Sequence, residues 1–176
     1  MKHIFSFCAV MLASGMFLGA QSLSFDVSGG SALYEDTSAV SVSPSVSWSF
    51  PKIANAIVPE AGIKMRYATL ESGTHSSEEY QVLAFARVKW FFAGPVSVIA
   101  QTGAGYASIT DSTYKGTVDL NAFVVEPGAG IGYDLRSIGF SLLCSPSFDI
   151  TDNGVKSCVM LEAGVRYVIP FGGADK

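Results

Sequence analysis

The chain has 176 residues, enough for one domain, with 11 basic and 15 acidic side chains and a net charge of −4. This mild acidity gives no reason to expect a nucleic-acid partner. Beyond residue 20 no segment holds the roughly 18 uncharged apolar residues of a membrane-spanning helix. A membrane protein with this sequence would therefore have to cross as a β-barrel, the other structure that satisfies its backbone inside lipid.

The N-terminal segment has the three-part pattern of a secretory signal. A short basic start is followed by an almost wholly apolar run over Ile4–Leu18, and small residues at Gly19 and Ala20 precede Gln21. The apolar run is too short for an uncleaved transmembrane anchor. We therefore predict a signal peptide over residues 1–20.

Removal of the signal peptide leaves one exported domain, which we expect over residues 21–171, and a short periplasmic tail over 172–176. The mature chain keeps 10 basic and 15 acidic residues because Lys2 is the only charge lost, so its net charge is −5.

Apolar and polar residues alternate with period two through the exported domain, which indicates strands with two different faces. Residues 38–50 show this best, because serines at odd positions alternate with mostly apolar residues at even positions. Eight strands of about ten residues, the length of a tilted membrane strand, are predicted over 23–33, 38–50, 61–69, 80–90, 96–106, 117–133, 138–150 and 159–169.

The connections between these strands fall into two sets. Those near 34–38, 70–79, 108–116 and 150–156 are polar, whereas those near 51–58, 93–95 and 134–137 are mostly shorter or more apolar. An even number of strands returns both chain ends to one side, so the polar loops all lie on the other side. This is the arrangement of an outer-membrane barrel.

The volume of the two strand faces decides which one points outward. A soluble barrel such as a lipocalin would turn the apolar face inward. An eight-stranded barrel has an interior only just wide enough for its own side chains, and the aromatic-rich face would overfill it. The face of Gly, Ser and Ala with scattered charges fits the lumen. The fold predicted is therefore an all-β, eight-stranded antiparallel up-and-down transmembrane β-barrel with aromatic belts at both interfaces.

Several residues break the regular pattern. A change of alternation near Val124–Val125 predicts a β-bulge. Proline inside a strand removes a donor from the ladder, so bulges or strand ends are expected at Pro44, Pro127 and Pro146. Cys144 and Cys158 fall on opposite faces of neighbouring strands, which favours two buried free thiols over a disulfide.

The polar face carries the ionisable side chains that could do work inside the barrel. Nine of them form the predicted lumen set: Asp26, Glu60, Lys64, Arg66, Arg87, Lys89, Glu126, Glu162 and Arg166. Buried charges must be paired or hydrated. Counting residues from the turns places Glu60 with Lys89, Asp26 with Arg166, and Arg66 and Lys64 with Glu126 and Glu162. Two interpretations stay open: salt bridges that fill the barrel, or a gate whose pairs exchange partners and admit ions. Asp119 is expected near the loop end.

Catalytic chemistry has one weak candidate. His75 and Ser77 with Glu78 or Glu79 resemble the histidine–serine–acid arrangement of the outer-membrane lipid A deacylase family, but they fall in a solvated loop where nothing preorganises them. One histidine and two separated cysteines give no metal-ligand spacing. We therefore expect no catalytic residue, metal or cofactor.

The chain resembles the small outer-membrane β-barrel domain family, which includes the outer-membrane protein A, X and W types. Pro127–Tyr133, with its alternating glycines and final tyrosine, is similar to a strand common in that family. Glu162–Ile169 resembles the last-strand signal read by the barrel-assembly machinery. The chain departs from the family by continuing past Phe171, the expected end of the barrel, instead of ending on an aromatic residue.

This resemblance implies a bacterial outer-membrane location, contact with membrane lipid and with the barrel-assembly machinery, and no nucleic-acid partner; we expect a monomer. A non-enzymatic structural or surface-exposed barrel, such as an antigen, is the first functional interpretation. A narrow porin-like channel for ions or small apolar solutes, as in the W type, is the second. A lipid-modifying enzyme that uses His75 is the third.

Overall fold

The computed structural model describes residues 20–34, 38–53, 56–72, 75–113, 116–152 and 154–171. The predicted signal peptide, apart from Ala20, and the predicted tail over 172–176 lie outside these residues. The described part of the chain forms one closed barrel in which every strand pairs antiparallel with its neighbours in sequence and β1 pairs with β8. Its eight strands are β1 (Ser22–Leu33), β2 (Ser38–Ser49), β3 (Ile57–Ser72), β4 (His75–Ala93), β5 (Val96–Thr113), β6 (Gly116–Leu135), β7 (Ile138–Thr151) and β8 (Gly154–Pro170).

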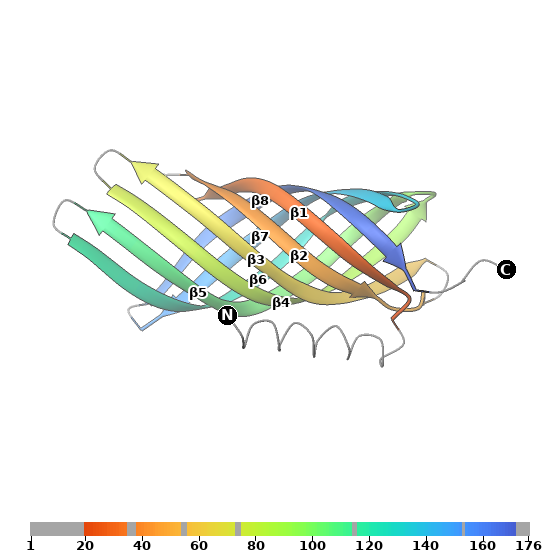
Figure 1. Cartoon of the computed structure of the whole chain (residues 1–176), viewed down its shortest axis with the longest axis horizontal. Coiled ribbons are helices and arrows are strands. Elements are labelled where there is room, and N and C mark those ends of the chain that lie inside the picture. Colours follow the sequence, from red (N-terminus) through yellow and green to blue (C-terminus); the bar gives the residue numbers. More distant parts are fainter. Residues whose placement is uncertain are drawn as a thin grey trace.

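The two ends of the barrel differ. β1 begins and β8 finishes at the same end, together with the short turns, and we call this the turn end (Figure 1). At the opposite end, the loop end, the β3–β4 and β5–β6 hairpins project beyond their neighbours (Figure 1). The segments 70–79 and 108–116, predicted as polar loops, are therefore mostly strand, since β3 continues to Ser72 and β5 to Thr113.

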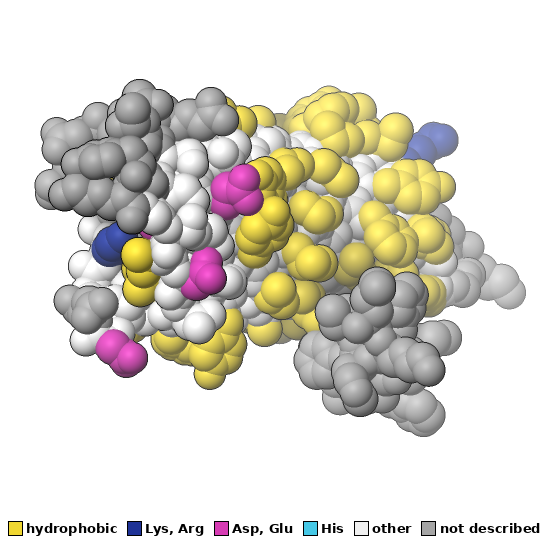
Figure 2. All heavy atoms as spheres, turned by 60° about the vertical axis from the view of Figure 1, so that its left-hand side comes forward, with side chains coloured by type: hydrophobic (Ala, Val, Ile, Leu, Met, Phe, Trp, Pro, Cys, Tyr) yellow, Lys and Arg dark blue, Asp and Glu magenta, His cyan; other side chains and the backbone are white. Residues whose placement is uncertain are grey.

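The outer wall of the barrel is apolar. Large hydrophobic side chains such as Tyr106, Val27 and Ile131 are more than half exposed. Figure 2 shows a field of hydrophobic side chains over the wall, with acidic side chains toward the loop end. Exposed aromatics lie near both ends, including Trp90 and Tyr167 near the turns and Tyr80 near the loops. Only a lipid environment suits so much exposed apolar surface, because soluble monomers rarely expose apolar patches of more than a few hundred Å².

Inside the barrel, the described lumen is charged in its middle and at the turn end, whereas toward the loop end it contains apolar side chains together with a few acidic ones. Two clusters make up the apolar part: Leu83, Ala107, Ile109, Ala122 and Val124 with Leu120, and Ala32, Ala39, Cys158 and Met160 with Tyr34 and Leu70. The β-bulge predicted near Val124–Val125 is wrong, because β6 keeps one register through its described pairs with β5 and β7. The change of pattern arose because Leu120 is apolar yet packs inside the barrel, so hydrophobicity did not mark the outer face there.

The strand prolines also differ from the prediction. Pro127 and Pro146 stand at opposing positions of β6 and β7, where the ladder is interrupted between the Val125–Phe148 and Ala129–Cys144 pairs without a change of register. Pro44 lies within a similar gap between β2 and β3, between the Val42–Tyr67 and Ser45–Lys64 pairs. The barrel thus accommodates missing donors by local gaps in a ladder, not by bulges or strand ends. A register shift does occur between β4 and β5, at Phe91 and Ala93.

The two cysteines of the exported domain are free and lie on opposite faces of the wall, as predicted. Cys158 is buried in the lumen, whereas Cys144 is exposed on the outer face, so the prediction that both thiols are buried is wrong for Cys144. The described residues include no helix long and apolar enough to span a membrane.

Candidate functional site: the charged lumen

The middle of the lumen holds a four-residue ion network. Lys64 and Arg66 come from β3, and their charged groups reach Glu126 on β6 and Glu162 on β8, across the barrel. Arg66 Nη1 lies 2.5 Å from Glu126 Oε2, and Nη2 lies 3.2 Å from Glu162 Oε2. We call these four residues the central network. Its two cations and two anions balance.

Polar neighbours complete the bonding of the central network. Arg66 donates to Gln81 Oε1 at 2.9 Å and to Ser43 Oγ at 3.3 Å, and Ser43 donates to Glu162 at 2.7 Å. Arg66, Glu126 and Glu162 are at most 2 % exposed. Since charges shielded from water interact more strongly than exposed pairs, this network has the geometry of a rigid crosslink between opposite walls.

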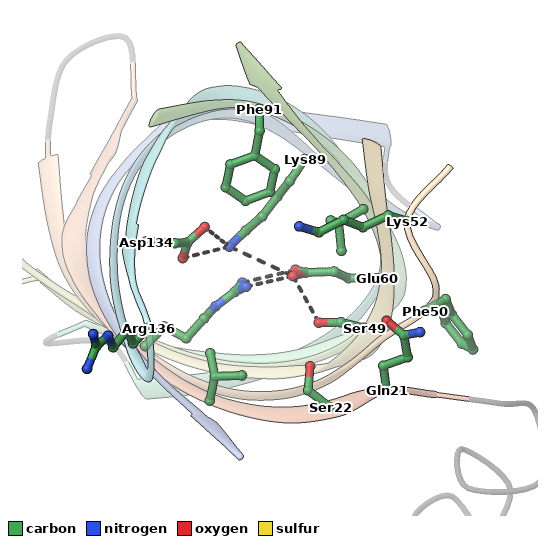
Figure 3. Close-up of a pocket in the computed structure, with 13 residues that line it drawn as sticks. Gln21, Ser22, Ser49, Phe50, Lys52, Glu60, Lys89, Phe91, Asp134 and Arg136 are labelled. Atoms are coloured by element: carbon green, nitrogen blue, oxygen red, sulfur yellow. Dashed lines mark hydrogen bonds and ion pairs between the residues drawn. The ribbon is translucent and has the colours of Figure 1, made fainter. Parts of the chain in front are cut away.

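A second network, which we call the turn-end network, lies on the turn side of the central network, and Figure 3 shows three of its side chains, Glu60, Lys89 and Asp134. It comprises six side chains: Asp26, Glu60, Arg87, Lys89, Asp134 and Arg166. Arg166 donates to Asp26 at 2.8 Å and to both oxygens of Glu60 at 2.6 and 3.0 Å. Lys89 donates to Asp134 at 2.8 Å. Three cations and three anions again balance, and the network ties β1 to β8 at the seam where the barrel closes.

All nine side chains of the predicted lumen set are buried inside the barrel. Asp26 and Arg166 meet across β1 and β8, at the position found by counting residues. Glu60, expected opposite Lys89, stands instead in register with Arg87; its nearest cation is Arg166, and Lys89 lies 3.8 Å away. Residue counting locates neighbours along a strand pair, but these long side chains also reach across the lumen.

Sequence reasoning missed several lumen residues. Asp134 was assigned to a turn, although it has the inward parity of Gly130 and Gly132 and binds Lys89. Gln81 falls in the strand predicted over 80–90, but its hydrogen bond from Arg66 was not predicted. Asp119, expected in the lumen near the loop end, points outward and accepts a hydrogen bond from Thr110 at 3.0 Å. This error has the same origin as the predicted β-bulge: the apolar side chain of Leu120 packs inside the barrel, so its neighbour Asp119 points outward.

The wall of the lumen also carries serine hydroxyls that the ion networks do not use. Six buried ones have no hydrogen-bond partner in the described part of the chain: Ser24, Ser41, Ser47, Ser97, Ser145 and Ser147. Buried polar groups are normally satisfied by protein or by water. These hydroxyls therefore give the lumen a capacity to hold water beside the salt bridges.

The histidine–serine–acid candidate is only partly described. His75 begins β4, but its side chain lies outside the described part of the structure. These residues form strand and not the solvated loop predicted. Ser77 and Glu79 face the lumen, whereas Glu78 is exposed outside. Glu79 is occupied by other donors: Gln81 at 2.5 Å and the Tyr34 hydroxyl at 3.5 Å. Among the described residues no group of His, Cys, Asp and Glu could hold a metal ion.

No family model and no curated protein matches the chain. Solved structures with a similar fold include Neisserial surface protein A, at 16% identity and a TM-score of 0.58 over 83% of this chain and 95% of that one. The N-terminal β-barrel domain of OprF from Pseudomonas aeruginosa matches at 13% identity and a TM-score of 0.53, over 86% and 99%. The outer membrane enzyme PagL matches at 15% identity and a TM-score of 0.52, over 83% and 99%.

At these identities the likeness concerns the fold, which is that of the small eight-stranded outer-membrane barrels. The apolar outer wall and the charged, packed lumen are the inside-out arrangement that a lipid environment requires. The protein is an integral β-barrel of the bacterial outer membrane, and its outer wall contacts lipid.

Proposed function

We propose that this protein is a non-enzymatic structural or surface-exposed barrel whose lumen is closed by its own salt bridges. The observation that carries the proposal is the stacking of two balanced ion networks, central and turn-end, each of which joins strands around the barrel. A barrel closed in this way presents its projecting hairpins on the cell surface and its apolar wall to the membrane, with no open path between.

Planar-bilayer recording of the refolded protein tests the closed lumen. We expect no conductance steps above the background of protein-free bilayers, because buried ion pairs at contact distance leave no continuous water path. Reproducible steps from the wild-type protein would contradict the proposal. A refolded porin of larger diameter serves as the control that insertion has occurred.

A second candidate is a narrow channel for ions or small solutes. The observation in its favour is the set of unpartnered serine hydroxyls, which could line a file of water beside the networks. Arg66→Ala separates the two functions. A gate would respond by a higher conductance or open probability, whereas a structural network would lose stability and leave conductance at background.

The similar structures do not decide whether this protein is an enzyme, because one of them, PagL, is named as an outer membrane enzyme. Glu79, the acid that could orient a histidine, is already bonded to Gln81, which argues against a catalytic arrangement. Mass spectra of lipid A from cells that express the wild-type protein should match those from cells without it. A mass shift that His75→Ala abolishes and Ser76→Ala retains would overturn the non-enzymatic proposal.

A further inference from the structure

The loop end of the lumen contains a cavity that neither ion network occupies. Its volume is about 180 Å³, and its lining includes three carboxylates, Glu79, Asp111 and Asp149, and three apolar or aromatic side chains, Tyr34, Leu70 and Ile109. We call it the vestibule. It lies beside the apolar clusters of the upper lumen, to which Ile109, Leu70 and Tyr34 belong.

Asp149 is the side chain that points to a ligand. It is only 2 % exposed, and its Oδ1 atom has no hydrogen-bond partner among the described residues. A buried carboxylate oxygen without a hydrogen-bond partner is costly, so structures normally supply it with a donor or a cation. Glu79 differs, because Gln81 and Tyr34 hold it in place from one side.

The charge around the vestibule is unbalanced, unlike that of the two networks below it. Among the described residues that line it, two buried carboxylates, Glu79 and Asp149, face one cation, Lys156, which stands opposite Asp149 in the β7–β8 register. The central network cannot offset this excess, since its own charges are matched. The cavity therefore has a negative potential and favours a cationic occupant.

The geometry and the walls narrow the kind of cation. In the described part of the chain no acidic group is arranged to hold a metal ion. Leu70 and Ile109 offer apolar surface, and the ring of Tyr34 is a surface on which an ammonium group can lie. A cavity of this size is smaller than the 300 Å³ or more typical of sites for drug-sized ligands, so the occupant is compact.

We propose that the vestibule binds a small organic cation from outside the cell, an ammonium group on an apolar body, with the carboxylates of Asp149 and Glu79 as its ionic partners. This inference goes beyond the proposed function and does not depend on it. Conductance tests the proposed closure of the lumen by the two ion networks, whereas cation binding tests the vestibule, which contains no residue of either network. The two proposals can therefore fail separately.

Isothermal titration of the refolded barrel in detergent tests the proposal with phenethylamine as the probe and 2-phenylethanol as its neutral counterpart. We expect saturable binding of the amine and at least about tenfold weaker binding of the alcohol. Asp149→Asn should weaken amine binding at least about tenfold, and Glu79→Gln should weaken it as well. Asp119→Asn is the matched control, because Asp119 lies at the same end but points outward, and it should leave binding unchanged.

Three results would overturn the proposal. Equal binding of amine and alcohol would mean partition into apolar surface. Equal effects of Asp149→Asn and Asp119→Asn would mean attraction to the general acidity of the loop end. Stoichiometric displacement of the amine by Mg²⁺ would mean an inorganic cation site. Heat-modifiable gel mobility verifies that each variant is folded, and Glu79→Gln carries the test if Asp149→Asn fails to fold.

Discussion

Replacement of Arg66 by alanine is the sharpest perturbation of the lumen. The side chain is 1% exposed, and its guanidinium contacts Glu126, Glu162, Gln81 and Ser43. Arg66→Ala leaves two buried glutamates facing Lys64 alone, so one negative charge in the middle of the barrel has no partner. It also removes the guanidinium group that donates a hydrogen bond to Gln81 Oε1.

The expected loss of unfolding free energy is about 3–5 kcal/mol, the cost of leaving one member of a buried ion pair without its partner. Arg66→Lys keeps the charge but cannot bond both glutamates and Gln81 at once, so we expect a smaller loss of about 1–2 kcal/mol, comparable to one hydrogen bond to a charged group. The double variant Arg66→Met with Glu126→Gln removes one cation and one anion. Its loss of unfolding free energy should be about 1–3 kcal/mol smaller than the sum of the losses of the single variants Arg66→Met and Glu126→Gln, and this difference is the coupling energy.

Unfolding of the barrel by guanidinium in lipid vesicles, followed by tryptophan fluorescence and by heat-modifiable mobility, measures these values. A loss below about 1 kcal/mol for Arg66→Ala, with no coupling energy in the double variant, would contradict a water-shielded network. It would mean that water reaches the network and that the ion pairs behave as exposed ones.

Two further predictions concern the wall and the orientation of the barrel. A Cβ at Gly105 would overlap the carbonyl oxygen of Val82, whereas a Cβ at Gly29 would meet its nearest atom at 3.9 Å. Gly105→Ala should therefore lower the unfolding free energy by about 1–3 kcal/mol in the same assay, and Gly29→Ala should change it hardly at all. Equal losses for the two variants would contradict the close approach at Gly105. In intact cells, a membrane-impermeant amine-reactive reagent should label Lys156, which lies at the loop end of the barrel, and should label Lys52, at the turn end, only after the cells are lysed. Mass spectrometry of the peptides measures the labelling. The reverse pattern would mean that the barrel has the opposite orientation.

Much of the fold was predictable because a barrel wall imposes period two on its residues. The serine–valine alternation of residues 38–50 identifies β2 and its lumen face, and the aromatic content of the other face decides that this face points outward. Parity also places the nine lumen charges inside. These predictions depend only on the pleat of the strand and on the volume of an eight-stranded barrel.

The errors have a common physical origin in the change of lumen chemistry along the barrel axis. Toward the loop end the lumen also contains an apolar cluster, against which Leu120 packs, so its inward side chain imitates a change of parity. Asp149, in contrast, follows the inward parity of Ser145 and Ser147 and could have been found from the pattern. The pairing of Arg66 with Glu126 across the barrel could be expected only as a shared height, because the bond itself depends on how far each long side chain extends into the lumen.

Fractionation of bacterial cells that express the full chain tests directly whether the protein is an integral outer-membrane barrel. We predict that the protein sediments with the outer membrane and resists carbonate extraction, that its mature N-terminus is Gln21 after removal of the signal peptide, and that its gel mobility changes on boiling. Recovery of the folded protein in the soluble periplasm would contradict this prediction, because the apolar wall would then have no lipid to cover it.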